Sequence, residues 1–145
     1  MKLISHRGNI DGKIEANENC PDYILSALDS GYDVEIDVRK IKNEWYLGHD
    51  YPQYVINRKF LNIPNLWIHT KNGDAFYELL KYKKLNVFWH NTDDFILTSK
   101  KFIWTFPNKQ LYKNSICVLP EKGYTGNIKK CHGICSDFIK KYKNL

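Results

Sequence analysis

Strand-like and helix-like segments alternate along the first half of the chain, and this order constrains the fold more than any other feature of the sequence. Apolar runs typical of strands lie at residues 2–5, 33–39, 66–69 and 86–90. The run at 33–39, "DVEIDVR", alternates strictly between apolar and polar residues. Helical patterns at 21–31 and 74–84 lie between the runs. This order predicts βαβ units and a parallel sheet.

The second half continues with short apolar runs but leaves no room for full helices. Its runs lie at residues 95–99, 102–106, 115–119 and 133–137, and a last helical segment follows at 138–144. Only Lys100 and Lys101 separate two of these runs. An ordinary (β/α)8 barrel has roughly 200 residues or more. Eight strand candidates, besides a return strand at 44–49, therefore predict a contracted (β/α)8 barrel that forms one domain, 1–145, with several helices shortened or missing.

Composition indicates a folded protein with anionic partners. Of the 145 residues, 43% are apolar, and the net charge of +6 favours phosphorylated molecules as well as nucleic acid. No recognition helix or aromatic-plus-basic RNA signature is present, so nucleic acid is not the expected partner. No apolar stretch is long enough to span a membrane, and the N-terminus lacks an export signal. We therefore expect a cytoplasmic protein with reduced cysteines; the pattern does not fix the oligomeric state.

Four of the five histidines follow strand-like segments. They are His6, His49, His69 and His90. Asp137 ends the run at 133–137 in the same way. The carboxyl ends of parallel strands meet at one edge of an α/β sheet, where ligand sites lie. A lone histidine is more often a structural residue, but this shared position predicts a common site.

Glu35 and Asp37 add two carboxylates to this predicted site. A period of two places both on one face of the strand, with Cα atoms about 6.5–7 Å apart. Two carboxylates that point into one space repel each other unless a cation compensates them. Their oxygen atoms suit Mg²⁺ or Ca²⁺. The alternative is an ordinary ion pair of one carboxylate with Arg7 or Lys71.

The order of the motifs resembles that of the glycerophosphodiester phosphodiesterases, whose superfamily also contains phosphatidylinositol-specific phospholipases C. Their pattern is HRG, then PENT, then ELDV, and then a hairpin that ends in HD. The corresponding segments here are "ISHRG" (4–8), "ENC" (18–20) and "GYDVEIDVRKIKNEWYLGHD" (31–50). A fainter likeness continues in "IHTK" (68–71), "FIWTF" (102–106) and "GICSDFI" (133–139).

This resemblance implies a phosphoric diester hydrolase of lipid metabolism, with a divalent metal and a role for each matched residue. His6 and His49 would be the general acid and base, and Arg7 and Lys71 would hold the phosphate. Glu35 and Asp37 would bind the metal. The supporting residues would be Glu18, Asn19 and Asp50. In that family a hydroxyl beside the phosphoester attacks phosphorus and gives a cyclic phosphate.

The chain departs from the family pattern at its third metal ligand, which is a glutamate in the family and His69 here. Histidine would favour Mn²⁺ or Zn²⁺, or would contact the phosphate directly. Glu121 is either a replacement carboxylate or an ordinary surface residue. His90 has no family counterpart and either contacts phosphate or belongs to a turn. Trp104 either lines the substrate pocket or packs in the interior.

These observations favour a metal-dependent phosphodiesterase that hydrolyses a glycerophosphodiester or another small or lipid-like alcohol phosphodiester. A first alternative is a non-catalytic module that binds phosphate or a phospholipid head group at the same residues. A second alternative is a basic nucleic-acid-binding protein or nuclease. The sequence names neither the alcohol nor the metal.

Overall fold

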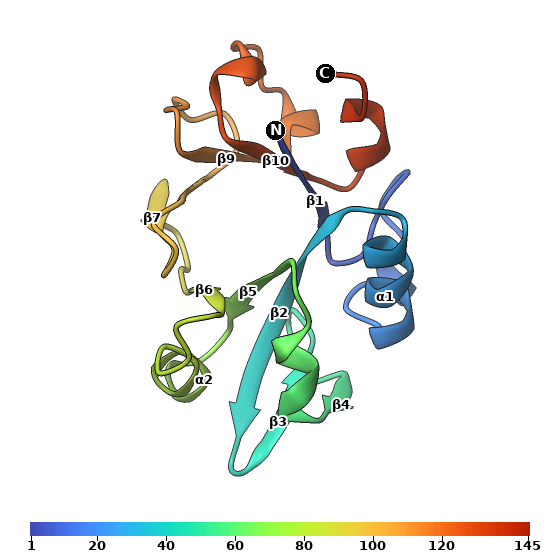
Figure 1. Ribbon diagram of the computed structural model, residues 1–145, viewed down its shortest axis with the longest axis vertical. Coiled ribbons are helices and arrows are strands. Elements are labelled where there is room, and N and C mark those ends of the chain that lie inside the picture. The colour runs from blue at the N-terminus through green and yellow to red at the C-terminus, as the bar shows by residue number, and fades with distance from the viewer.

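The computed structural model describes residues 1–145 and contains ten strands in one curled mixed sheet (Figure 1). The strands are β1 (Lys2–His6), β2 (Asp33–Ile41), β3 (Glu44–Leu47), β4 (Tyr54–Ile56), β5 (Leu66–Thr70), β6 (Asn86–Phe88), β7 (Phe95–Leu97), β8 (Ile103–Thr105), β9 (Ser115–Val118) and β10 (Gly133–Ser136). Hydrogen-bonded neighbours follow the order β4-β3-β2-β1-β10-β9-β8-β7. The sheet branches at β2, which also pairs with β5, and β5 pairs with β6.

Two α-helices cover part of the outer face of this sheet. The helix α1 (Pro21–Asp29) begins with a proline, whose fixed φ suits a first helical position. The helix α2 (Gly73–Leu79) begins after Asn72, whose Oδ1 accepts a hydrogen bond from the backbone N of Ala75 at 3.3 Å. The remaining helical segments are 3₁₀ helices at Glu15–Asn17, Arg58–Asn62, Pro120–Lys122, Ile128–Lys130 and Ile139–Tyr142.

No helix in the structure has the length and apolar character needed to cross a membrane.

The prediction of a contracted (β/α)8 barrel is wrong. The structure has only two α-helices, and the pairs β2–β3, β3–β4 and β7–β8 are antiparallel. The chain between β7 and β8 is a short turn, so the two strands form a hairpin instead of a βαβ crossover. Beyond residue 80 only loops and 3₁₀ helices join the strands. The region 50–64 contains β4, which pairs with β3.

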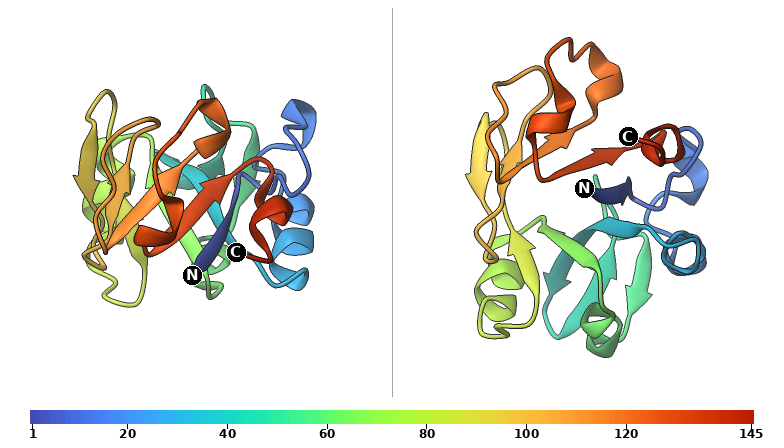
Figure 2. Two further views of the ribbon diagram at one scale, coloured as in Figure 1. Left: turned by 90° about the horizontal axis from the view of Figure 1, so that it is seen from above. Right: turned by 45° about the horizontal axis from the view of Figure 1, so that its top comes forward.

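The two ends of the curled sheet meet at Ser99 and not through a paired strand. The backbone N of Ser99 donates to the carbonyl oxygen of Val87 in β6 at 2.8 Å. The Ser99 hydroxyl accepts from the Val87 N at 2.9 Å and donates to the Leu85 carbonyl oxygen at 3.1 Å. Ser99, between β7 and β8, therefore bonds the hairpin to β6, and the neighbouring Lys100 donates from Nζ to the Lys83 carbonyl oxygen. Figure 2 shows the same curled arrangement from two further sides.

Alternation along β2 separates the outer core from the site. Val34, Ile36 and Val38 pack in the largest apolar cluster, together with Ile24 of α1 and Leu79 of α2. The apolar side of the strand therefore faces the helices. Glu35 and Asp37 consequently point to the other side of the sheet, where both are almost fully buried.

Candidate functional site

A pocket of about 620 Å³ lies at the carboxyl edge of the parallel strands. Among its lining residues are eight of the predicted site residues: His6, Arg7, Glu35, His49, His69, Lys71, His90 and Trp104. Four of the five histidines thus share one pocket, as their positions after strands predicted. His132 alone lies elsewhere, against Phe102. The structure brings these side chains together.

The turn after β1 positions the first of these residues. Arg7 and Gly8 both have positive φ, 55° and 95°, so the chain turns sharply as the strand ends. The Arg7 N donates to the Glu35 carbonyl oxygen at 2.9 Å, which holds this turn against β2. A Cβ on Gly8 would lie 2.5 Å from the ring of Tyr23. Only glycine fits here, because the turn needs a left-handed conformation and the ring of Tyr23 fills the adjacent space.

His6 is held by a carboxylate from the far end of the chain. Its Nδ1 lies 2.7 Å from Oδ1 of Asp137, and the same oxygen accepts from Nδ2 of Asn9 at 2.8 Å. Burial alone would raise the pKa of Asp137, but its bonds to His6 and Asn9 and the nearby Arg7 lower it below its ordinary value. An ionised Asp137 fixes the imidazole and leaves Nε2 directed toward Glu35, 3.9 Å from Oε2.

The two carboxylates of β2 meet His69 of β5 in the interior. His69 Nδ1 lies 3.2 Å from Oδ1 of Asp37 and 3.5 Å from Oε1 of Glu35. Burial alone would lower the pKa of His69, but the two carboxylates raise it above its ordinary value. Burial alone would raise the pKa of Asp37, but His69, Arg7 and Lys71 hold it well below its usual range. An imidazolium beside two carboxylates is the arrangement that these shifts favour.

Arg7 and its neighbours compensate the charge of the buried Asp37. Arg7 Nε lies 2.8 Å from Asp37 Oδ2, and Lys71 Nζ lies 3.7 Å from Asp37 Oδ1. The ion pairs considered from the sequence as an alternative to a metal site are therefore present. Asn19 donates from Nδ2 to Asp37 Oδ2 and accepts from the Asp37 N, both at 2.9 Å. Glu18 accepts from Arg7 Nη1 at 3.0 Å, so both residues of the "EN" pair hold this network.

His90 stacks on His69 at the mouth of the pocket. Their ring centroids are 4.6 Å apart and the rings are nearly parallel, at 7°. Partial burial and the positive charges of His69 and Lys71 lower the pKa of His90 to about 4, so this ring is neutral at pH 7. A neutral ring can cover the charged His69 without repelling it.

His49 reaches the pocket from the loop after β3. Its Nδ1 lies 2.7 Å from Asp50 Oδ1, and its side chain is about two-fifths exposed. A neighbouring pocket of about 610 Å³ shares only Arg7 and His49 with this one and also contacts Glu18, Asn19 and Asp50. His49 therefore lines two pockets and is partly exposed, whereas His6 is buried.

The structure also shows where Glu121 and Trp104 lie. Glu121 accepts from the Ser136 hydroxyl at 2.9 Å and from the Asp137 N at 2.8 Å, outside the group formed by Glu35, Asp37 and His69. It therefore holds the end of β10. Trp104 packs against Phe88 at 4.5 Å between ring centroids and also lines the pocket, so its packing and its place at the site are compatible.

Glu35, Asp37 and His69 fit a divalent cation. One ligand atom from each lies within 4.8 Å of the others. Glu35 Oε2 and Asp37 Oδ1 are buried and accept no hydrogen bond, and His69 would give up its proton to bind the cation through Nδ1, which faces both carboxylates. In a second group, formed by His6, Glu18 and Asp137, one ligand atom from each residue also lies within 4.8 Å of the others. Hydrogen bonds to Arg7 and Asn9, and between His6 and Asp137, already occupy that group.

Asp137 and Asn9 are the members of the site to which the sequence assigned no role. Asp137 ends a strand, which is a usable signal, but its contact with His6 links residues 131 positions apart. Asn9 gives no signal in the sequence. In comparisons with protein-family models, curated proteins and solved structures, the chain matches none of them.

Proposed function

We propose that this protein is a metal-dependent phosphodiesterase that acts on a glycerophosphodiester or another small or lipid-like alcohol phosphodiester. The observation that carries the proposal is the shared pocket of His6 and His49, beside Arg7 and Lys71 and above the carboxylates of β2. Two imidazoles supply the two proton transfers of the reaction. The cationic side chains favour a phosphate between them.

His6 is the better general base of the pair. Buried Asp137 holds its Nδ1 and leaves Nε2 free to accept a proton, whereas Asp50, the partner of His49 Nδ1, is exposed. The hydroxyl beside the phosphoester gives its proton to this atom while its oxygen bonds to phosphorus. The bond from phosphorus to the leaving alcohol breaks, and His49 donates a proton to the departing oxygen. The products are an alcohol and a cyclic phosphate, which water opens with the two roles exchanged.

The charges around the phosphate come from the chain's own residues. Arg7 supplies the first positive charge. Burial alone would lower its pKa, but the carboxylates of Asp37, Glu35 and Glu18 raise it above its ordinary value. Lys71 is the second and lines the same pocket. Glu35, Asp37 and His69 would hold the divalent metal, which stabilises negative charge on the phosphate oxygens when bound. Asn19 and Glu18 keep the carboxylates and Arg7 in place.

Hydrolysis of a glycerophosphodiester, and of its analogue without the neighbouring hydroxyl, tests this proposal. With Mg²⁺, Ca²⁺ or Mn²⁺ we expect turnover of the first substrate only, and a cyclic phosphate in the ³¹P NMR spectrum. His6→Asn and His49→Asn should each lower kcat about 10²-fold or more. His132→Asn is the matched control, because this histidine lies outside the pocket. Equal losses in all three variants, or no turnover with any metal, would contradict the proposal.

A second candidate function, phosphate binding without turnover, has an observation of its own in its favour. Position 69 is a histidine, and Asp37 is already paired with His69, Arg7 and Lys71. Cations of the chain thus balance this carboxylate. If this function holds, inorganic phosphate binds equally well with chelator and with metal, and Lys71→Ala weakens it, while no phosphodiester is cleaved.

A further inference from the structure

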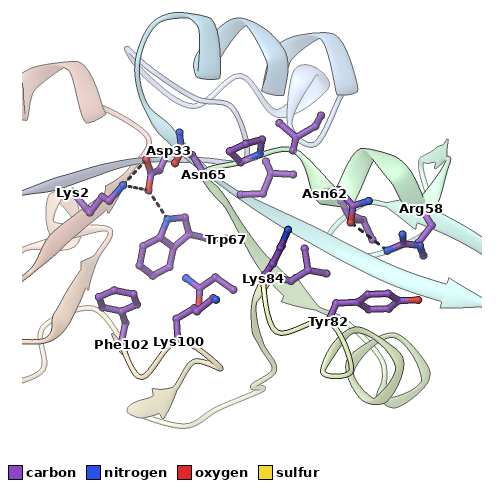
Figure 3. Close-up of a pocket in the computed structure, with 16 residues that line it drawn as sticks. Lys2, Asp33, Arg58, Asn62, Asn65, Trp67, Tyr82, Lys84, Lys100 and Phe102 are labelled. Carbon is purple, nitrogen blue, oxygen red and sulfur yellow. Dashed lines mark hydrogen bonds and ion pairs between the residues drawn. The ribbon is translucent and has the colours of Figure 1, made fainter.

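A second large pocket lies at the opposite edge of the sheet, where the parallel strands begin. Its volume is about 710 Å³, and it shares no residue with the candidate phosphodiesterase pocket. The starts of four strands contribute Lys2, Asp33, Trp67 and Asn86, and Phe102 lies directly before β8. Figure 3 shows Trp67 and Phe102 at one end, Arg58 and Tyr82 at the other, and Lys84 between them.

The charge of this pocket is strongly positive. Lys2, Arg58, Lys84 and Lys100 line it, and Asp33 is the one carboxylate. Asp33 already has two partners within the protein, since its Oδ2 accepts a hydrogen bond from Trp67 Nε1 at 2.9 Å and lies 3.0 Å from Lys2 Nζ. The other three cations form no ion pair. An anionic ligand would therefore meet cations whose charge no carboxylate neutralises.

Flat apolar surfaces lie beside these cations. The buried indole of Trp67 is fixed by Asp33 and packs 5.1 Å from the ring of Phe102. At the other end the Arg58 guanidinium lies 4.4 Å from the centroid of Tyr82, and its Nη1 donates to Asn62 Oδ1 at 3.3 Å. A guanidinium over a ring still has N–H groups that can donate to an anion. Together these surfaces suit a planar ring that carries a negatively charged group.

One polar atom at this pocket lacks a partner. The side-chain oxygen of Asn86 is buried and accepts no hydrogen bond. A buried acceptor without a donor costs free energy, and a ligand N–H group would satisfy it. Lone phosphate has no such group and no ring, whereas a phosphorylated heteroaromatic compound has both.

We propose that this pocket binds a small phosphorylated heteroaromatic ligand, of which nucleoside monophosphates are the simplest. The ring lies against the Trp67 and Phe102 end, where Asn86 accepts its amino or imino proton. Lys84, Arg58 and Lys100 hold the phosphate. This site is independent of the proposed phosphodiesterase chemistry, because the two pockets have no residue in common.

Calorimetric titration of the full chain with the four nucleoside monophosphates tests the proposal. Adenosine and inorganic phosphate are titrated as partial ligands. We expect at least one nucleotide to bind in 0.15 M salt, and each partial ligand to bind at least about tenfold more weakly. If no nucleotide binds at millimolar concentration, or if inorganic phosphate binds the Lys71→Ala variant as tightly as the nucleotides do, the proposal is overturned.

Charge-reversal variants locate the binding. Lys84→Glu should weaken nucleotide binding by about tenfold or more, while Lys81→Glu, an exposed lysine outside the pocket, should leave it unchanged. Both positions are on the surface, so thermal unfolding will show whether each variant is folded. Lys71→Glu should also leave the affinity unchanged. Loss of binding in Lys71→Glu and not in Lys84→Glu would place the nucleotide in the other pocket and refute this assignment.

Discussion

Gly8 is the residue whose backbone the candidate site depends on most, because it lets the chain turn away directly after His6 and Arg7. We expect Gly8→Ala to lower the free energy of unfolding by about 1–3 kcal/mol, since the new Cβ meets both a positive φ and the ring of Tyr23. Gly31→Ala is the control, because its φ of 87° is similar but no atom lies within 4 Å. Urea unfolding measures both, and equal losses would show that the contact with Tyr23 is unimportant.

His90 makes the pH dependence of stability testable at a single residue. Its pKa is about 4 in the folded protein and about 6.5 when unfolded, so between these values the unfolded chain binds more protons. The free energy of unfolding therefore falls as the pH drops from about 6.5 toward 4, because only the unfolded chain protonates His90 in this range. We expect His90→Asn to show a smaller loss of unfolding free energy between pH 7 and pH 4.5 than the unchanged protein. Parallel pH curves would contradict this assignment.

At the scale of elements, the join between β6 and the β7–β8 hairpin is not a strand pairing, and the hydrogen bonds to β6 itself come from Ser99. Ser99→Ala removes the side-chain bonds to the Val87 N and the Leu85 carbonyl oxygen. We expect a loss of about 1–2 kcal/mol in unfolding free energy and faster hydrogen exchange at the Val87 amide.

Ser30→Ala is the matched control for this substitution, since the Ser30 hydroxyl donates a single exposed bond to the Ser26 carbonyl oxygen at the end of α1. Its loss should be smaller and should leave exchange at Val87 unchanged. If Ser99→Ala and Ser30→Ala are indistinguishable, backbone bonding alone holds β6 to the hairpin.

At the scale of the whole molecule, the two proposed sites lie at opposite edges of one sheet and should act separately. Each ligand that binds only the folded chain raises its stability. We expect the rises in Tm produced by a divalent metal and by a nucleotide to add, within the error of additivity for distant sites. Glu35→Gln should abolish only the metal increment and Lys84→Glu only the nucleotide increment. A metal increment that survives Glu35→Gln would place the cation elsewhere.

The sequence predicted the elements better than their arrangement. Alternation at 33–39 located β2 and both of its faces, because apolar and polar residues partition locally. The position of β1 between β2 and β10 depends on pairing across more than a hundred residues, and no local pattern encodes it. Eight strand candidates then favoured a contracted (β/α)8 barrel, although β7 and β8 form an antiparallel hairpin and no α-helix follows residue 80.

The sequence likewise predicted some residues of the candidate site and missed others. His6 and His69 were found because each ends or follows a strand-like run, and Glu35 was found because it shares one face of its strand with Asp37. Asp137 received no role, since its contact with His6 appears only when β10 pairs with β1. The amino-edge pocket gave no signal at all: Lys2, Trp67 and Lys84 are ordinary residues until the fold gathers them.

The sheet curls but does not close into a barrel, because no strand pairing joins β6 to the β7–β8 hairpin. Asn86 of β6 and Phe102 before β8 face one pocket, while His90 and Trp104, from the same two sides of the join, face the other. Residues from both sides of the join thus line both pockets. A substitution at Ser99 that shifts the hairpin relative to β6 is therefore expected to change the shape of both pockets together.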